Sequence, residues 1–280
     1  MNHDAVGSFT EPTCISWDSQ DAMLYALGVG AGLHDHLCDL CFTTENSAGI
    51  SQRTLPTFGL HLSQRKMSVS LGDFDTANLI HAGQQFELLT EVPVQGSAFI
   101  TARIESISDL GTAALGVIET VMDDASTGER LLTAKTTALV KGAGGFGGEV
   151  PARDDWERPS REPDLVEEVV TLPGQSLLYR LSGDRNPLHS DPAFAQRAGF
   201  EGPILHGMCT YGMTARVLAH AFSEEASTTL RAMSGRFSAP AFPGDTLEVR
   251  AWFESDGMLF QTSRQDGTVV IDKGRANLTG

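Results

Sequence analysis

The sequence predicts an α+β fold in which antiparallel β-sheet wraps around buried helices. Each half of the chain ends in three runs of alternating apolar and polar residues, and short turns join the runs. Period-two alternation of this kind is typical of an antiparallel sheet with one covered face. Helical pattern precedes the strands in both halves, and in the second half it is apolar on nearly every side. A helix without a polar face is buried, so we expect the sheet to enclose it.

In the first half, one helix and three strands are expected. Asp18 is a suitable N-cap for a helix over 21–27, in which Ala22, Met23 and Ala26 recur at helical spacing. The expected strands cover residues 100–105, 113–121 and 131–140, with Gly- and Asp-containing turns between them. Together they predict a three-stranded meander.

Glycine and proline interrupt the pattern near the middle. Five of the seven residues from Gly142 to Gly148 are glycine, and Pro151, Pro159 and Pro163 follow. This density predicts a linker over 142–164 between an N-terminal unit, 1–141, and a C-terminal unit, 165–280. The same glycines satisfy the G-x-G-x-x-G dinucleotide pattern, but prolines stand where its helix must begin. We therefore interpret them as a flexible or tightly packed glycine segment.

The second half has a similar plan with a longer helix. Asp191 is expected to cap a short helix that has Pro192 at its first position and Gly199 just beyond its end. The apolar helix follows over 206–222, and strands are expected over 247–253, 258–264 and 269–278. The runs 83–88 and 244–249 share a glycine followed by an apolar-Glu-apolar triplet, a weak sign of an internal repeat.

Composition and charge exclude several classes of protein. The 280 residues include 20 Lys and Arg against 36 Asp and Glu, a formal net charge of −16. This balance argues against binding to nucleic acid or to an anionic membrane surface. The apolar runs are too short to span a bilayer, the amino end lacks a secretory pattern, and four cysteines are too few for a disulfide framework. A cytoplasmic protein with reduced thiols is expected.

Two cysteines and two histidines lie close together between His34 and Cys41, yet no second pair of ligands at zinc-site spacing accompanies them. We interpret this segment as a loop or a helix end, and we expect no metal site.

The segment from Tyr179 to His189 carries the strongest chemical signal. Asp184 and His189 are a carboxylate and an imidazole five positions apart, and Asn186 lies between them. An acid and a base that reach one water could deprotonate it and return the proton elsewhere. The alternative is structural, with Asp184 in an Asx-Pro turn and His189 as a partly buried hydrogen-bonding residue. On these residues alone, both interpretations stay open.

The start of the apolar helix bears on this choice. Gly207 follows Gly202-Pro203-Ile204-Leu205-His206, and a glycine there leaves backbone N–H groups open at the positive end of the helix dipole. Such groups can hold a developing oxyanion, for example the enolate of a thioester. In the structural alternative, Gly207 only permits close packing. An oxyanion site near water-activating groups suits addition or removal of water across a double bond next to a carbonyl.

The run from Tyr179 to His189, with Ala195 six positions later, resembles the hydratase 2 motif of MaoC-like (R)-specific enoyl-CoA hydratases. The runs 24–31, 55–59 and 144–148 also look like the hydratase 2 region of peroxisomal multifunctional enzyme type 2. This resemblance implies a double hotdog, with two long buried helices each wrapped by antiparallel sheet. The first half has no Asp-x-Asn-Pro-x-His, so the resemblance implies that it shapes the acyl pocket.

The implied activity is reversible hydration of trans-2-enoyl-CoA to (3R)-hydroxyacyl-CoA. The resemblance places the catalytic pair on Asp184 and His189, with Asn186 orienting the water and the N–H of Gly207 as oxyanion donor. Contacts to the acyl-CoA substrate are expected from these residues: His81, Ala82, Leu110, Arg185, Pro187, Leu188, Gly207 and Phe237.

No metal and no cofactor beyond the coenzyme A of the substrate are expected, because the thioester already polarises the double bond. The resemblance also implies a homodimer. Relatives usually have a basic residue at the position of Leu110, which cannot pair with a phosphate, so Arg231 and Arg236 are candidates to replace it. Three alternatives stay open: a thioesterase, an acyl carrier protein dehydratase, and a non-catalytic acyl-CoA binding module. A carrier-protein dehydratase would need a basic docking face, which the net charge of −16 disfavours.

Overall fold

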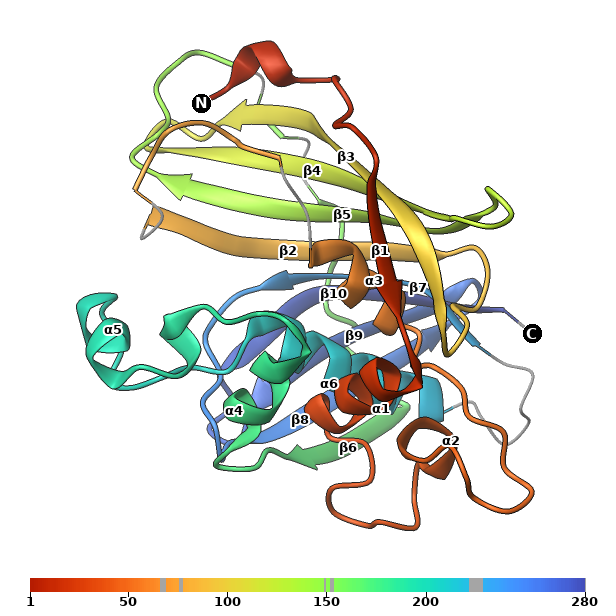
Figure 1. The fold of residues 1–280 in the computed structure, drawn as a ribbon. Coiled ribbons are helices and arrows are strands. Elements are labelled where there is room, and N and C mark those ends of the chain that lie inside the picture. Colours follow the sequence, from red (N-terminus) through yellow and green to blue (C-terminus); the bar gives the residue numbers. More distant parts are fainter. Residues whose placement is uncertain (66–68, 76–77, 149, 152–153, 222–228, 280) are drawn as a thin grey trace.

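A computed structural model of the chain describes residues 1–65, 69–75, 78–148, 150–151, 154–221 and 229–279 (Figure 1). Its strands form one antiparallel sheet in the order β1-β3-β4-β5-β2-β7-β10-β9-β8-β6. The strands of the first half are β1 (Thr13–Trp17), β2 (Leu79–Leu88), β3 (Gly96–Asp109), β4 (Ala113–Asp124) and β5 (Arg130–Lys141). Those of the second half are β6 (Leu165–Val170), β7 (Thr229–Phe237), β8 (Thr246–Glu254), β9 (Gly257–Arg264) and β10 (Val269–Thr279).

The sheet order reveals a repeat. In each half a short edge strand, a three-stranded meander and a fifth strand follow in the same spatial order, and the fifth strands, β2 and β7, pair with each other. Both predicted meanders are therefore confirmed. The sequence repeat was wrong in its alignment, because run 83–88 lies on β2 and run 244–249 leads into β8, which occupy different places in the two halves. Gly83 lies inside β2 beside its bulge, whereas Gly244 precedes the start of β8.

Each half of the sheet covers a helix, but the two helices differ in length. Helix α6 (Gly207–His220) has 14 residues, most of them buried, and packs against β7 and β8. Helix α3 (Phe58–Gln64) has seven residues and packs against β4 and β5. The expectation of two long helices was thus wrong for the first half. The predicted end of α6 at Phe222 lies outside the described residues.

Further helices lie outside the sheet. Helix α1 (Ser19–Gly28) begins at Asp18 in a capping box with Asp21, which confirms the predicted cap, and it packs against α4 (Gln175–Tyr179). Helix α5 (Pro192–Arg197) is capped by Asp191, as predicted. The remaining elements are α2 (Leu40–Thr43) and the 3-10 turns η1 (His3–Ala5), η3 (Arg180–Ser182) and η4 (Pro187–His189). No described helix is long and apolar enough to cross a membrane.

The glycine-rich segment is packed against the first half. The buried carboxylate of Asp109 accepts backbone hydrogen bonds from Gly145 at 2.9 Å and from Gly147 at 2.6 Å. Both glycines have positive φ angles, 86° and 74°, a conformation that side chains disfavour. Further along, the indole of buried Trp156 donates to the carbonyl of Gly274 at 2.9 Å. Of the two sequence interpretations, tight packing holds, and the division into units at 142–164 stays a prediction.

Candidate active site

The loop that carries Asp184 and His189 is built from local side chain to backbone hydrogen bonds. Asp184 Oδ1 accepts from the N–H of Asn186 at 3.1 Å, and Asn186 Oδ1 accepts from the N–H of Leu188 at 3.0 Å, capping η4. The structural role considered for Asp184 is therefore present. An ionised carboxylate has about four acceptor positions, so this one bond leaves it free to bind another donor.

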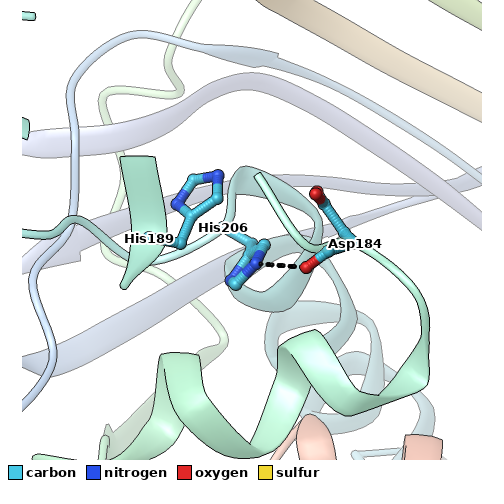
Figure 2. A group of neighbouring side chains, drawn as sticks. All are labelled: Asp184, His189 and His206. Atoms are coloured by element: carbon cyan, nitrogen blue, oxygen red, sulfur yellow. Dashed lines mark hydrogen bonds between the residues drawn. The ribbon is translucent and has the colours of Figure 1, made fainter. Parts of the chain in front are cut away.

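Three side chains meet at this loop: Asp184, His189 and His206 (Figure 2). A carboxylate oxygen and one nitrogen from each ring lie within 4.8 Å of one another. Asp184 is exposed, whereas His189 and His206 are buried. Two hydrogen bonds of about 2.8 Å can together span roughly 5.6 Å, so one water can bridge the carboxylate and an imidazole.

The hydrogen bonds of His189 define which of its nitrogens can act as a base. Its Nδ1 lies 2.9 Å from the carbonyl oxygen of Ile204, which can only accept, so Nδ1 carries the proton. Burial lowers the pKa of His189, because desolvation disfavours the imidazolium. The neutral ring therefore keeps its Nε2 lone pair for a hydrogen bond from water.

His206 is a site residue that the sequence analysis quoted without assigning it a role. Its ring stacks on His189 with centroids 3.7 Å apart, and its Nε2–H donates to the backbone carbonyl of Asp184 at 3.2 Å. Burial, and then the neighbouring His189, lower the pKa of His206 to about 4. Its position directly before Gly207, as the N-cap of α6, is the signal that could have identified it.

The same three residues are the one metal-ligating group found in the described part of the chain. Their geometry disfavours such use. The two rings are nearly parallel, inclined by 26°, so their in-plane lone pairs run side by side. A metal lies about 2.1 Å from each ligating nitrogen and needs lone pairs that converge.

Gly207 begins α6 beside this cluster. A Cβ added at Gly207 would lie 3.3 Å from the ring of Phe237, so the glycine lets that ring approach the helix start. Within the described residues, its N–H has no hydrogen-bond partner. An open N–H at the positive end of a 14-residue helix is a suitable donor to an anionic oxygen.

The cluster also receives residues from the first half of the chain. His81 lies on β2, where its ring packs against Phe237 of β7 with centroids 4.8 Å apart, and the negative charge of Asp184 acts on it. Ala82 follows at the bulge in the β2–β5 pairing. The β2–β7 junction therefore brings His81, Phe237, Gly207 and the Asp184 loop together.

Of the other predicted substrate contacts, three lie on the Asp184 loop and Leu110 lies elsewhere. Arg185 and Pro187 are exposed on the loop, and Leu188 is partly buried. Leu110 is 43% exposed in the turn between β3 and β4, outside the cluster. Arg231 and Arg236 lie on β7. A groove of about 520 Å³ crosses β2, β7, β9 and β10 and contains none of the predicted site residues.

Comparison with known proteins relates the chain to one group of enzymes. Residues 155–274 match the MaoC like domain, and residues 15–142 match the MFE-2 hydratase 2 N-terminal domain. The chain is 39% identical to 3-hydroxyacyl-thioester dehydratase Y of Mycobacterium tuberculosis, with 98% of this chain and 97% of that protein covered. It is also 39% identical to enoyl-CoA hydratase ChsH3 of the same organism, with 95% of each covered.

Solved structures relate the chain to the same group of enzymes. A MaoC-like dehydratase from Phytophthora capsici superimposes with a TM-score of 0.87 at 29% identity, covering 100% of this chain and 98% of that one. A M. tuberculosis protein described as a double hotdog matches at a TM-score of 0.63 and 16% identity, covering 98% of this chain and 96% of that one. The double hotdog expected from the sequence is confirmed.

Proposed function

Because this chain belongs to the MaoC-like dehydratase family and carries the hydratase 2 N-terminal domain, we propose that it is an (R)-specific enoyl-CoA hydratase. The reaction adds water across the double bond of trans-2-enoyl-CoA and gives (3R)-hydroxyacyl-CoA. Its relatives include both a hydratase and a dehydratase, as expected for a reversible reaction.

In the proposed mechanism, one water donates a hydrogen bond to the Asp184 carboxylate and another to Nε2 of His189. Nε2 of His189 can accept this bond, since the ring is held neutral with its proton on Nδ1. A water that donates both hydrogens presents an oxygen lone pair to carbon 3 of the substrate. The separations of up to 4.8 Å within the cluster suit such a bridging water.

Asp184 then acts as the general base. As it takes a proton from water, the C3–O bond forms and the π electrons of the double bond move onto the thioester oxygen. The N–H of Gly207 stabilises that enolate-like oxygen. The proton then passes from the Asp184 carboxyl to Nε2 of His189 and on to carbon 2, as the thioester carbonyl forms again and both side chains return to their starting states. The open N–H at the start of α6 is the feature that supports the oxyanion role.

One observation carries this proposal. A carboxylate, a neutral imidazole with a free Nε2 and an open helix N–H come from separate elements to one place, where His81 and Phe237 line the same site. The structural alternative accounts for the Asp184 and Asn186 hydrogen bonds to backbone and for the bond from His189 Nδ1 to the carbonyl of Ile204. It gives no role to the free Nε2 of His189 or to the open N–H of Gly207.

Hydration of crotonyl-CoA by purified variants tests the proposal. Replacing Asp184 by Asn or His189 by Ala should lower kcat by about 10² to 10⁴-fold, the contribution of a positioned acid or base. Asp191→Asn is the matched control, because that carboxylate lies in the same segment and caps α5. Activity of Asp184→Asn or His189→Ala within about tenfold of wild type contradicts the assignment.

Two further outcomes identify other functions. Release of the free coenzyme A thiol with no 3-hydroxyacyl-CoA product indicates a thioesterase, because cleavage of the thioester also removes the enoyl absorbance. Tight acyl-CoA binding with no change in that absorbance indicates a non-catalytic module. Chiral analysis of the product with enoyl-CoAs of increasing chain length then establishes stereochemistry and acyl preference.

A further inference from the structure

We propose that His61 and Arg65, both on the N-terminal side of the fold, are positioning residues that hold the Asp184 loop through the carbonyl oxygen of Ser182. This inference rests on the proposed function, because it concerns the placement of the proposed base. It gives the half without the catalytic motif a part in positioning the proposed base.

Two side chains from the first half converge on a single backbone oxygen of the second half. His61 Nε2 lies 2.9 Å from the carbonyl oxygen of Ser182, and Arg65 Nε donates to the same oxygen at 2.8 Å. These partners are 121 and 117 positions apart in the sequence. A carbonyl oxygen has two lone pairs, so these two donors satisfy it completely.

The donors are themselves fixed. His61 is buried in α3, where its ring stacks on Tyr25 with centroids 4.9 Å apart. Arg65 uses a second nitrogen, Nη2, to form an ion pair with Asp21 of α1 at 3.0 Å. We call these contacts of His61 and Arg65 with the Ser182 carbonyl the bracket. The bracket connects α1 and α3 to the end of η3, directly before the loop.

Gly183 explains why the loop needs this bracket. It lies between Ser182 and Asp184 with a φ of 146°, a region that is open mainly to glycine. Glycine gives the chain more conformational freedom at this joint than any other residue would. An added Cβ would lie 3.3 Å from Arg65 Cγ, so the arginine stem packs directly against the joint. With the preceding carbonyl held and the following one bonded to His206, both sides of the joint are anchored.

The consequence falls on the proposed catalytic pair. Asp184 is an exposed residue, and its carboxylate has one described hydrogen bond, to Asn186 in the same loop. Its distance to His189 therefore depends on how the loop backbone is held. His61 and Arg65 hold the incoming side and His206 holds Asp184 itself, so the base is positioned by contacts from α1, α3 and α6.

The test compares Arg65→Gln with Arg65→Met, because glutamine and methionine side chains are equal to each other in length. In Arg65→Gln the amide nitrogen takes the place of Nε and can still donate to Ser182, whereas Arg65→Met places a methyl group there. Both lose the ion pair with Asp21, so the difference between them isolates the bond to the carbonyl. Arg103→Met is the control, because Arg103 Nε makes a comparable ion pair with Glu119 on β3 and β4, at 2.6 Å.

We expect Arg65→Met to lower kcat for crotonyl-CoA hydration by at least tenfold, toward the roughly 10²-fold loss that a misplacement of about 1 Å produces. KM should stay near the wild-type value, Arg65→Gln should retain most of kcat, and Arg103→Met should match wild type. Hydrogen exchange of the backbone amides in 180–189 should accelerate in Arg65→Met and stay near wild type in Arg65→Gln. Equal kcat in wild type and Arg65→Met, or equal losses in both Arg65 variants, overturns the inference.

Hydrogen exchange separates this inference from the proposed function. A wild-type protein that does not hydrate any enoyl-CoA refutes the hydratase assignment. The exchange rates of the amides in 180–189 still test whether Arg65 holds the loop, because they are measured without substrate and do not depend on activity. Identical exchange in wild type and Arg65→Met then shows that Arg65 does not position this loop.

Discussion

The buried histidines should make the free energy of unfolding depend on pH. Burial lowers the pKa of His61 to about 4, whereas an imidazole in the unfolded chain titrates near 6.5. Between these values the unfolded chain binds more protons than the folded chain does. Stability is therefore complete above about pH 6.5 and falls as the solution is acidified toward pH 4.

The magnitude follows from the two pKa values. For one group with pKa values of about 4 and 6.5, moving from pH 8 to pH 5 lowers the free energy of unfolding by about 2 kcal/mol. Burial, and then the stacked His189, also lower the pKa of His206, so its contribution has the same sign. Because His61 is 4% exposed, solvent screening reduces its contribution little.

His61→Gln isolates one of these contributions. Glutamine places a donor nitrogen near the position of Nε2, so the bond to Ser182 can persist, but it does not titrate. Urea unfolding followed by circular dichroism at pH 8 and pH 5 gives the loss for each protein. Wild type should lose about 2 kcal/mol more than His61→Gln over this interval.

The comparison uses the change with pH, so any constant cost of the substitution cancels. His36→Gln, at an exposed position, is the control and should behave as wild type does. Equal losses in wild type and His61→Gln would refute the reasoning, since they would mean that His61 takes up its proton as easily in the folded chain as in the unfolded one.

Two further predictions concern stability, one at a hydrogen-bonded carboxylate and one at a closely packed helix position. Asp109→Asn should lower the melting temperature at neutral pH, because the backbone N–H groups of Gly111, Gly145 and Gly147 lower the pKa of this carboxyl by stabilising its ionised form. The difference from wild type should shrink as the pH falls, and a constant difference in thermal scans would contradict this origin. Gly212→Ala should destabilise the protein, because its Cβ would lie 2.6 Å from Val29 Cγ1. Overpacking costs about 1 to 3 kcal/mol against a gain of about 1 kcal/mol in helix propensity, so a higher melting temperature than wild type would count against it.

Much of the fold follows from local pattern. The meander strands alternate with period two because one face of each packs on a core, and Asp18 and Asp191 cap helices through their own neighbouring N–H groups. Strand β7, in the middle of the sheet, was not predicted. Its sequence does not alternate simply between apolar and polar residues, because Ser234 and Gly235 interrupt the pattern. The short α3 was missed for a similar reason, since six consecutive buried residues show no periodicity.

Some residues of the candidate site can be recognised from the sequence, and others only from the fold. The Asp184–His189 motif is visible because its residues are five positions apart and its turn chemistry is local. His206 lies 17 positions beyond His189, and only the fold stacks the two rings. His61 and Arg65 are further still, more than 100 positions from the loop that they contact.

By itself, the sequence determined the meanders, the helix caps and the acid–imidazole loop, because each depends on residues close together in the chain. The tertiary structure alone decided the pairing of β2 with β7, the stacking of His206 on His189 and the bracket from His61 and Arg65. These contacts join residues that hydrophobic periodicity and turn preferences do not relate. Their partners are chosen by the packing of two half-sheets against each other, which no local pattern specifies.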